Sequence, residues 1–170
     1  NRMSVVMSHK VPLSPPTLFL MVGLPGAGKT TKSQEIEATE KAFRFNADEW
    51  LLILYGKYFD KSKRDAVKKL IEEIQWNLAK RALALGQNVV IDWGLWSIEE
   101  RKMYRAHAEA LGAKVKMIFL DAPLDVLWER IAKRPESQEG ILQITREDLE
   151  EWSKRFQRPS QEELSSAESQ

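Results

Sequence analysis

The stretch TLFLMVGLPGAGKTT, residues 17–31, decides the fold of this chain. Residues 17–22 form a short apolar run, which predicts a buried strand of a parallel sheet. Residues 23–30 fit the pattern G-x-x-x-x-G-K-[ST], whose glycines let the backbone wrap closely around phosphate groups and point N–H groups inward. The sequence therefore predicts a phosphate-binding loop between a strand and a helix, which is the context that this motif requires.

The same loop predicts a site for ATP and Mg²⁺. In such a loop Lys29 reaches the β- and γ-phosphates, and the Thr30 hydroxyl ligates Mg²⁺. The helix that begins near Gly28 adds its positive N-terminal end. ATP is the expected donor because no guanine-reading motif is apparent. The alternative, a chance glycine-rich turn with a solvated lysine, is disfavoured by the complete motif. The residues expected to hold the nucleotide are Gly23, Leu24, Pro25, Gly26, Ala27, Gly28, Lys29, Thr30 and Thr31.

Composition excludes several classes of protein. The 26 basic and 25 acidic residues give a net charge of +1, which argues against a polybasic membrane binder and disfavours a long nucleic-acid acceptor. The absence of cysteine excludes disulfides, zinc–thiolate sites and cysteine nucleophiles. No apolar run approaches the ~20 residues of a membrane helix, and the N-terminus lacks the apolar core of a signal peptide. We therefore expect a cytoplasmic protein with no membrane partner.

Strand-like and helix-like segments alternate after the loop. The first helix is expected to run from the loop to about Thr39. Helices should then begin at Ser97, which has capping-box spacing to Glu100, and at Thr145, which has a similar spacing to Asp148. The further strands are expected at 42–45, 88–92 and 114–120, and the further helices at 61–85, 97–111, 123–133 and 145–156.

This alternation predicts an α/β fold, namely a three-layer P-loop sandwich with a mostly parallel sheet of four or five strands. The 170 residues fit one domain. We expect an extended N-terminal arm at 1–16, a P-loop domain at 17–157 with a helical lid at about 130–145, and a polar, frayed tail at 158–170.

The helix expected at 61–85 carries an apolar stripe with the 3.6-residue period. Trp76 lies off this stripe, so it is predicted to face solvent, a neighbour or a ligand. Trp128 falls on the stripe of a later helix and is expected in the core, whereas His9 and His107 are expected at the surface. The stripe consists of Val67, Leu70, Ile71, Ile74 and Leu78.

Two aspartates follow strands, where the carboxyl ends of parallel strands gather on the ligand side of a sheet. Asp48 could accept the proton of a hydroxyl that attacks the γ-phosphate. It fits equally well as an ordinary first-turn acid of a helix capped by Asn46. Asp92 is favoured as a Walker-B-type acid that holds Mg²⁺ or its water, with a helix cap as the alternative. Trp93 and Trp96, just after Asp92, could wall an acceptor pocket or pack under a loop.

Arg130 and Arg134 lie four residues apart, so we expect them on the same side of their helix. They could close over the triphosphate and neutralise charge in the transition state. A solvated face is an equally good interpretation, because Glu129 and Lys133 nearby form an i,i+4 pair.

The chain contains the segments GLPGAGKTT, NADEW, VVIDWGLWSIEER and FLDAPLDVLWERIAKR. Together they resemble the small P-loop kinases grouped with polynucleotide kinase, chloramphenicol phosphotransferase and zeta toxin, and especially bacterial proteins called AAA family ATPases. The resemblance covers about residues 17–157. It implies that Asp48 acts on the acceptor hydroxyl and that Arg130 and Arg134 are lid arginines. The chain departs from the family at Leu51, where these kinases often carry an arginine that contacts the acceptor.

Three functions follow as hypotheses. The first is an ATP-Mg²⁺-dependent kinase that phosphorylates a hydroxyl of a small molecule or a nucleic-acid end. The second is an enzyme similar to nucleoside monophosphate kinases, in which the basic stretch at 57–69 would bind the acceptor phosphate, although such a run is usually a solvated face. The third is a nucleotide-binding module that hydrolyses ATP slowly or not at all. The sequence names neither the acceptor nor the oligomeric state.

Overall fold

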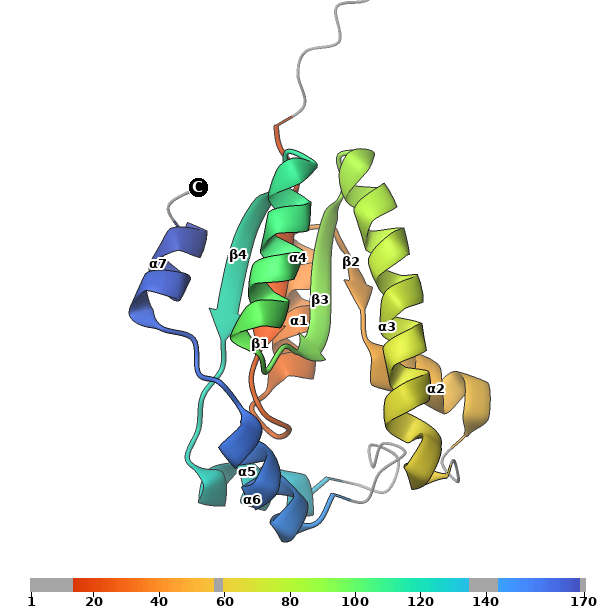
Figure 1. Ribbon diagram of the computed structural model, residues 1–170, viewed down its shortest axis with the longest axis vertical. Coiled ribbons are helices and arrows are strands. Elements are labelled where there is room, and N and C mark those ends of the chain that lie inside the picture. Colours follow the sequence, from red (N-terminus) through yellow and green to blue (C-terminus); the bar gives the residue numbers. More distant parts are fainter. Residues whose placement is uncertain (1–13, 57–59, 135–143, 169–170) are drawn as a thin grey trace, which may run out of the picture.

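A computed structural model describes residues 14–56, 60–134 and 144–168 (Figure 1). Strands and helices alternate through most of this part of the chain, as expected. The first two strands and the helix between them have the predicted bounds, and the third strand runs further than predicted, to Gly94. The elements are β1 Thr17–Val22, α1 Lys29–Thr39, β2 Ala42–Phe45, α2 Ala47–Tyr55, α3 Lys61–Ala84, β3 Asn88–Gly94, α4 Ile98–Ala110, β4 Lys114–Phe119, α5 Leu124–Ala132, α6 Arg146–Arg155 and α7 Gln161–Glu168.

The sheet has four strands in the order β2-β3-β1-β4, and every pair is parallel. The strand that carries the phosphate loop, β1, is therefore central, with β3 on one side and β4 on the other. A register shift separates Leu20 from Val22, so Val22 pairs with Gly94 at the end of β3. The α/β class and the parallel sheet are confirmed, and the described residues form four strands rather than five.

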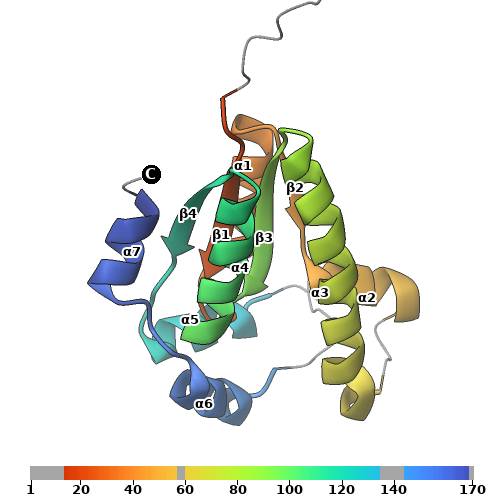
Figure 2. The same ribbon diagram turned by 45° about the horizontal axis from the view of Figure 1, so that its top comes forward.

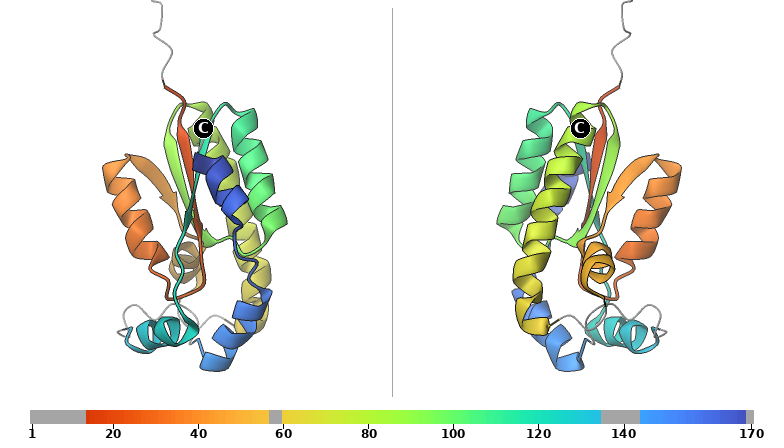
Figure 3. Two further views of the ribbon diagram at one scale, coloured as in Figure 1. Left: turned by 90° about the vertical axis from the view of Figure 1, so that its left-hand side faces the viewer. Right: turned by 90° about the vertical axis from the view of Figure 1, so that its right-hand side faces the viewer.

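Helices cover both faces of the sheet, so the three-layer arrangement is confirmed (Figure 3). Side chains alternate along β1 because successive residues of a strand point to opposite faces. Leu18, Leu20 and Val22 join the core under α3 and α4, whereas Phe19 and Met21 join the core under α1. Both sets are at most 5% exposed.

The carboxyl ends of the strands open onto α2, the first half of α3, α5 and α6 (Figures 1 and 2). A separate apolar cluster joins the phosphate loop to α5 and α6, with Ala27, Leu127 and Leu149 buried at its centre and Trp128 packed against them. This cluster fixes α5 and α6 beside the loop. Trp128 thus packs in an apolar cluster as predicted, although its side chain is only half-buried.

The apolar stripe predicted for α3 is wrong for three of its members. Leu70, Ile74 and Leu78 are exposed, by 58%, 54% and 37%. Gln75 and Trp76 are buried in their place. Burial of Gln75 is possible because its amide has polar partners inside the fold, namely the Asn46 carbonyl and the Trp93 indole. Trp76 packs edge-on against Tyr104 of α4 and donates a hydrogen bond to His107. The sequence predicts that it faces solvent, a neighbour or a ligand, and the structure places it against neighbouring side chains.

The tail also differs from the prediction, because residues 161–168 form helix α7 beside β4. Leu164 packs against the main core, and Glu163 forms an ion pair of 2.6 Å between its Oε1 and Nε of the fully buried Arg101. A polar composition predicted fraying, but this ion pair and this leucine hold the helix against the rest of the fold.

No helix in the described ranges is both long and apolar enough to cross a bilayer. The predicted arm, most of the predicted lid, Lys57 and His9 lie largely or wholly outside the described residues.

Candidate active site

The phosphate loop is held by backbone contacts that require glycine. The N–H of Gly23 donates to the carbonyl of Gly94 at 3.0 Å, which ties the loop to the end of β3. Gly26 has a φ of +84°, and a Cβ there would lie 2.7 Å from the carbonyl oxygen of Leu127 in α5. Gly28 caps α1 in the left-handed region, with a φ of +95° and no side-chain cap bond. The first turn of α1 contains no acid, so its free N–H groups and positive end suit an anion.

Lys29 is the charged group of the loop. Its Nζ donates to the backbone carbonyl of Leu24 at 2.9 Å. Burial lowers the pKa of Lys29 to about 8, and the nearby charge of Asp92 opposes this shift. An ammonium group that is poorly solvated in this way gains most from a phosphate partner.

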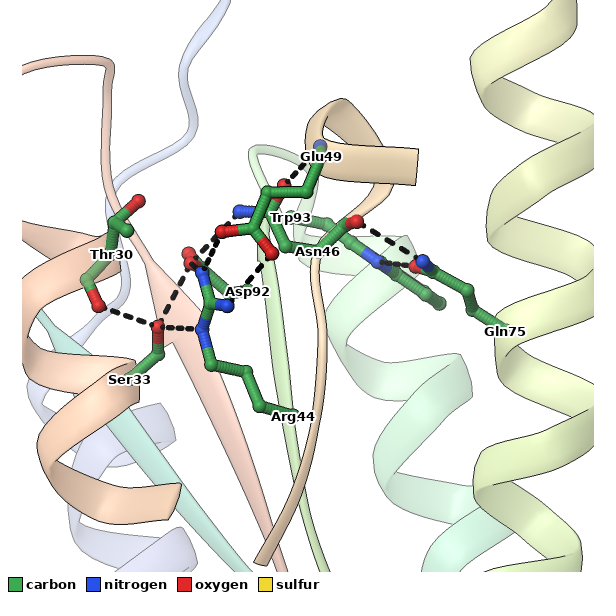
Figure 4. Close-up of polar contacts among 8 residues, drawn as sticks. All are labelled: Thr30, Ser33, Arg44, Asn46, Glu49, Gln75, Asp92 and Trp93. Atoms are coloured by element: carbon green, nitrogen blue, oxygen red, sulfur yellow. Dashed lines mark hydrogen bonds and ion pairs between the residues drawn. The ribbon is translucent and has the colours of Figure 1, made fainter. Parts of the chain in front are cut away.

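Asp92 is almost fully buried and lies in a dense polar network (Figure 4). Its Oδ2 accepts hydrogen bonds from Ser33 Oγ at 2.9 Å, Asn46 Nδ2 at 3.0 Å and Arg44 Nη2 at 3.2 Å. Arg44 also pairs with Glu49 through two nitrogen–oxygen contacts of 2.7 and 2.9 Å. These partners come from α1, β2 and α2, so the network joins the elements that surround the end of β3.

The same network connects Asp92 to Thr30. Ser33 Oγ lies 2.9 Å from the Thr30 carbonyl oxygen as well as from Asp92 Oδ2. Thr30 itself is exposed at the first turn of α1. The structure thus places the two predicted metal-linked residues close together, one exposed and the other buried. The alternative role of Asp92 as a helix cap is not observed, because Ser97 caps α4.

Asp48 lies in the first turn of α2, and Asn46 caps this helix by accepting from the N–H of Glu49. The capping interpretation is therefore correct for Asn46, yet Asp48 still faces the cleft described below. Its Oδ1 lies 2.9 Å from Arg64 Nη2 and 3.4 Å from Lys68 Nζ, both in α3. Desolvation opposes ionisation of Asp48, but Lys68 and Arg64 outweigh it and hold the pKa of this carboxyl below its ordinary value.

A cleft of about 1100 Å³ joins these groups. Its wall runs from the phosphate loop past the start of α2 to α3, the end of β3, α4 and α6. Pockets for one small ligand usually measure about 300–1,000 Å³, so this cleft has room for a nucleotide and part of a second molecule. The predicted site residues that line it are Gly23, Pro25, Lys29, Thr30, Asp48, Asp92 and Arg134.

Aromatic side chains form the far wall of the cleft. Trp93 is buried, donates to Gln75 Oε1 at 2.7 Å and packs edge-on against Tyr104. Trp96 is half-buried, packs against Trp152 of α6 and donates to the carbonyl of Gly23 at 3.3 Å. Trp93 and Trp96 therefore both pack in the fold and both line the cleft, and their role as the wall of an acceptor pocket stays a prediction.

The two predicted lid arginines lie in different places, and only Arg134 lines the cleft. Helix α5 ends at Ala132, so Arg134 lies beyond it. Arg130 is exposed, its Nη1 donates to the backbone carbonyl of Gly26 at 3.3 Å, and it does not belong to the cleft wall. The expectation that both arginines project from one side of a helix is wrong because Arg134 lies beyond the C-cap residue Lys133 of α5.

Sequence reasoning missed several residues of the site. Arg44 and Ser33 bind Asp92, and Arg64 and Lys68 bind Asp48, although each partner is far from its aspartate in the chain. Leu51, which replaces the family's arginine, is fully buried. The only available signal was the basic stretch at 57–69, whose members Arg64, Lys68 and Lys69 line the cleft.

Comparisons agree with this architecture. The sequence profile of the family described as AAA domain matches residues 18–159. No curated protein matches the sequence. A chain of the Pnkp1/Rnl/Hen1 RNA repair complex superimposes with a TM-score of 0.68 at 22% identity over 91% of this chain, which spans only 45% of that chain.

Two further solved structures are similar. A protein from Chloroflexus aurantiacus, described as a candidate kinase, has a TM-score of 0.66 and 23% identity, over 84% of this chain and 80% of its own. A gluconokinase from Sinorhizobium meliloti has a TM-score of 0.58 and 17% identity, over 88% of this chain and 79% of its own. The profile match, the phosphate loop and the parallel sheet show that this chain belongs to the AAA-domain family of P-loop proteins.

Proposed function

We propose that this protein is a kinase that transfers the γ-phosphoryl group of ATP to a hydroxyl of a second molecule. One observation carries the proposal: a single cleft joins Lys29 and Thr30 of the phosphate loop to the half-exposed carboxylate of Asp48. A site for the phosphate donor and a group that can receive a proton therefore share one cavity. The similar structures, which include a gluconokinase and a candidate kinase, support the same reaction class.

On the donor side, the first N–H groups of α1 and the Lys29 ammonium would bind the β- and γ-phosphates. Lys29 would exchange its contact with the Leu24 carbonyl for the phosphates. Arg134 lines the same cleft near Lys29 and Asp48, where it would add positive charge near the group in transfer.

The oxygen atoms of Thr30 and Asp92 suit Mg²⁺, which prefers oxygen ligands and keeps several waters. The donor set fits this ion because Thr30 and Asp92 both supply oxygen atoms to the wall of the same cleft. The described residues contain no group of three His, Cys, Asp or Glu that could hold a metal, so the phosphates would supply the other ligands. Bound Mg²⁺ would neutralise charge on the β- and γ-phosphates.

Asp48 would orient the acceptor hydroxyl. The hydroxyl oxygen forms a bond to the γ-phosphorus while the bond from that phosphorus to the bridging oxygen breaks and ADP leaves. The hydroxyl proton passes to Asp48 and then to solvent. Because Lys68 and Arg64 keep the pKa of Asp48 low, its carboxylate is charged at neutral pH and can accept this hydrogen bond.

An acceptor phosphate, as in nucleoside monophosphate kinases, is less well supported. Arg64 and Lys68 line the cleft, but both already pair with Asp48. A phosphate placed there would compete with the carboxylate that the reaction needs.

Release of ADP and of phosphorylated product from a panel of hydroxyl compounds tests the proposal. We expect at least one acceptor to raise ADP release well above the rate with water, and Lys29→Met to abolish it. Slow ADP release that no acceptor stimulates would instead identify a nucleotide-binding module.

A further inference from the structure

The cleft continues beyond Asp48 into a space between α3 and α4, which we call the acceptor end. Its wall contains Glu72 and Trp76 of α3, Glu100 and Tyr104 of α4, and Trp93 of β3. The phosphate-loop end of the cleft is basic, whereas this end presents carboxylates beside aromatic rings.

The two carboxylates are partly buried and lack a cation within ion-pair distance in the described part of the chain. Burial raises the pKa of Glu72 to about 7, with Glu100 and Asp48 adding to the shift and Lys68 opposing it. Burial also raises the pKa of Glu100. Two carboxylates that are poorly solvated and unpaired favour a cationic partner.

Within the described ranges, Tyr104 adds an unpartnered hydroxyl to the acceptor end, independently of the two carboxylates. It is only 7% exposed, lines the acceptor end, and its hydroxyl has no hydrogen-bond partner among the residues that the structure describes. Glu100 and Glu72 lie close enough that their charges add to burial in raising the pKa of this hydroxyl. The hydroxyl oxygen is accessible from the cleft although the rest of the side chain is buried, so it can exchange a hydrogen bond with a ligand there.

The cations near the acceptor end do not cancel these charges. Lys68 is 3.4 Å from Asp48, and Lys69 is exposed to solvent. His107 Nδ1 accepts a hydrogen bond from Trp76 Nε1 at 3.3 Å, and within the described ranges His107 forms no ion pair with Glu72 or Glu100. Trp76 and Trp93 add aromatic surface, which attracts cations.

We propose that the phosphate acceptor is a hydroxyl compound that carries a protonated amine, and that its ammonium group lies between Glu72, Glu100 and the Tyr104 hydroxyl. This inference rests on the proposed kinase function, since it assigns the acceptor class of the same cleft. With the ammonium group held there, a hydroxyl of the same molecule would extend toward Asp48 and the γ-phosphate.

The test uses three sets of compounds that differ in charge. They are glucosamine, N-acetylglucosamine, glucose and glucuronate; ethanolamine, ethylene glycol and glycolate; and kanamycin and its fully N-acetylated form. Binding to the full chain loaded with a non-hydrolysable ATP analogue is measured by calorimetry, and transfer is measured as phosphorylated product. We expect the amines to bind best within their sets, by about tenfold or more, since one added ion pair of about 1.4 kcal/mol has that effect.

Glu72→Gln and Glu100→Gln should each weaken binding of the amines about tenfold and leave the neutral members within about twofold. Glu99→Gln is the matched control, because Glu99 adjoins Glu100 on α4 but is exposed and lies outside the cleft wall. Amines that bind in this pattern but are never phosphorylated support the inference and contradict the kinase function. Phosphorylation of neutral or anionic members with no preference for amines supports the kinase function and overturns the inference, as does binding that Glu72→Gln and Glu100→Gln leave unchanged.

Discussion

The guanidinium of Arg44 lies 3.2 Å from the carboxylate of Asp92, measured between Nη2 and Oδ2, and both side chains are almost fully buried. Arg44 thus supports the acid at the end of the strand next to the phosphate loop. The same arginine pairs with Glu49 at the start of α2, one residue after Asp48. The geometry of the donor side and that of the acceptor side therefore depend on one side chain.

Arg44→Gln should destabilise the protein by about 2–4 kcal/mol, because Asp92 would keep its burial but lose its charged partner. Urea unfolding measures this change. Lys32→Gln, which removes an exposed pair with Glu35, is the control and should change the stability by less than about 1 kcal/mol. Equal effects of the two substitutions would show that the buried pair is not a structural support.

Gly26→Ala should both destabilise the protein and weaken ATP binding. The new Cβ would lie 2.7 Å from the Leu127 carbonyl, so the loop or α5 must move. Gly112→Ala is the matched control, because Gly112 has a similar φ of +79° with open space around it. It should show only the backbone cost of about 1–2 kcal/mol. If both variants bind ATP equally well, the close contact between loop and α5 does not shape the site.

Nucleotide binding should be linked to a proton on Lys29. Its pKa is about 8 in the free protein, and phosphates should restore the charged form. ATP affinity should therefore fall as the pH rises above about 8, and roughly three quarters of a proton should be taken up at pH 8.5. Calorimetry at pH 8.5 in buffers of different ionisation enthalpy measures this uptake, with pH 7.0 as the reference. Binding heats that are the same in all buffers at pH 8.5 contradict the prediction.

Glu72→Gln should stabilise the unliganded protein at pH 8. The pKa of Glu72 is about 7 in the folded state, above the ordinary value of 4.5. Below pH 4.5 the carboxyl is neutral in both states and burial costs nothing, whereas above pH 7 the full cost of the buried charge applies. The gain should be about 1–3 kcal/mol at pH 8 and should vanish near pH 4.5. A gain that is independent of pH would point to packing instead of charge.

Local patterns predicted the fold well because each acts over a few residues. The loop motif, the strand at 42–45 and the Ser97 and Thr145 caps all appear as expected. The stripe of α3 could not be predicted, because a buried Gln75 depends on Asn46 and Trp93, which lie far away in the chain. For the same reason, a helix that docks through Glu163 looked like a frayed tail.

The site was predictable only in part. The motif located Lys29 and Thr30, and strand ends located Asp48 and Asp92. The partners of these acids, Arg44, Arg64 and Lys68, come from other elements, and no short pattern connects them.

Single-turnover transfer from γ-labelled ATP tests the central claim most directly, with wild type, Asp48→Asn and the control Asp65→Asn, which changes an exposed carboxylate of the same cleft. The acceptor is the best substrate of the panel. We predict that Asp48→Asn binds ATP within about twofold of wild type but transfers the label about 10²–10⁴-fold more slowly, while Asp65→Asn stays near the wild-type rate. Transfer by Asp48→Asn at the wild-type rate, or label that passes only to water in every protein, would contradict the account.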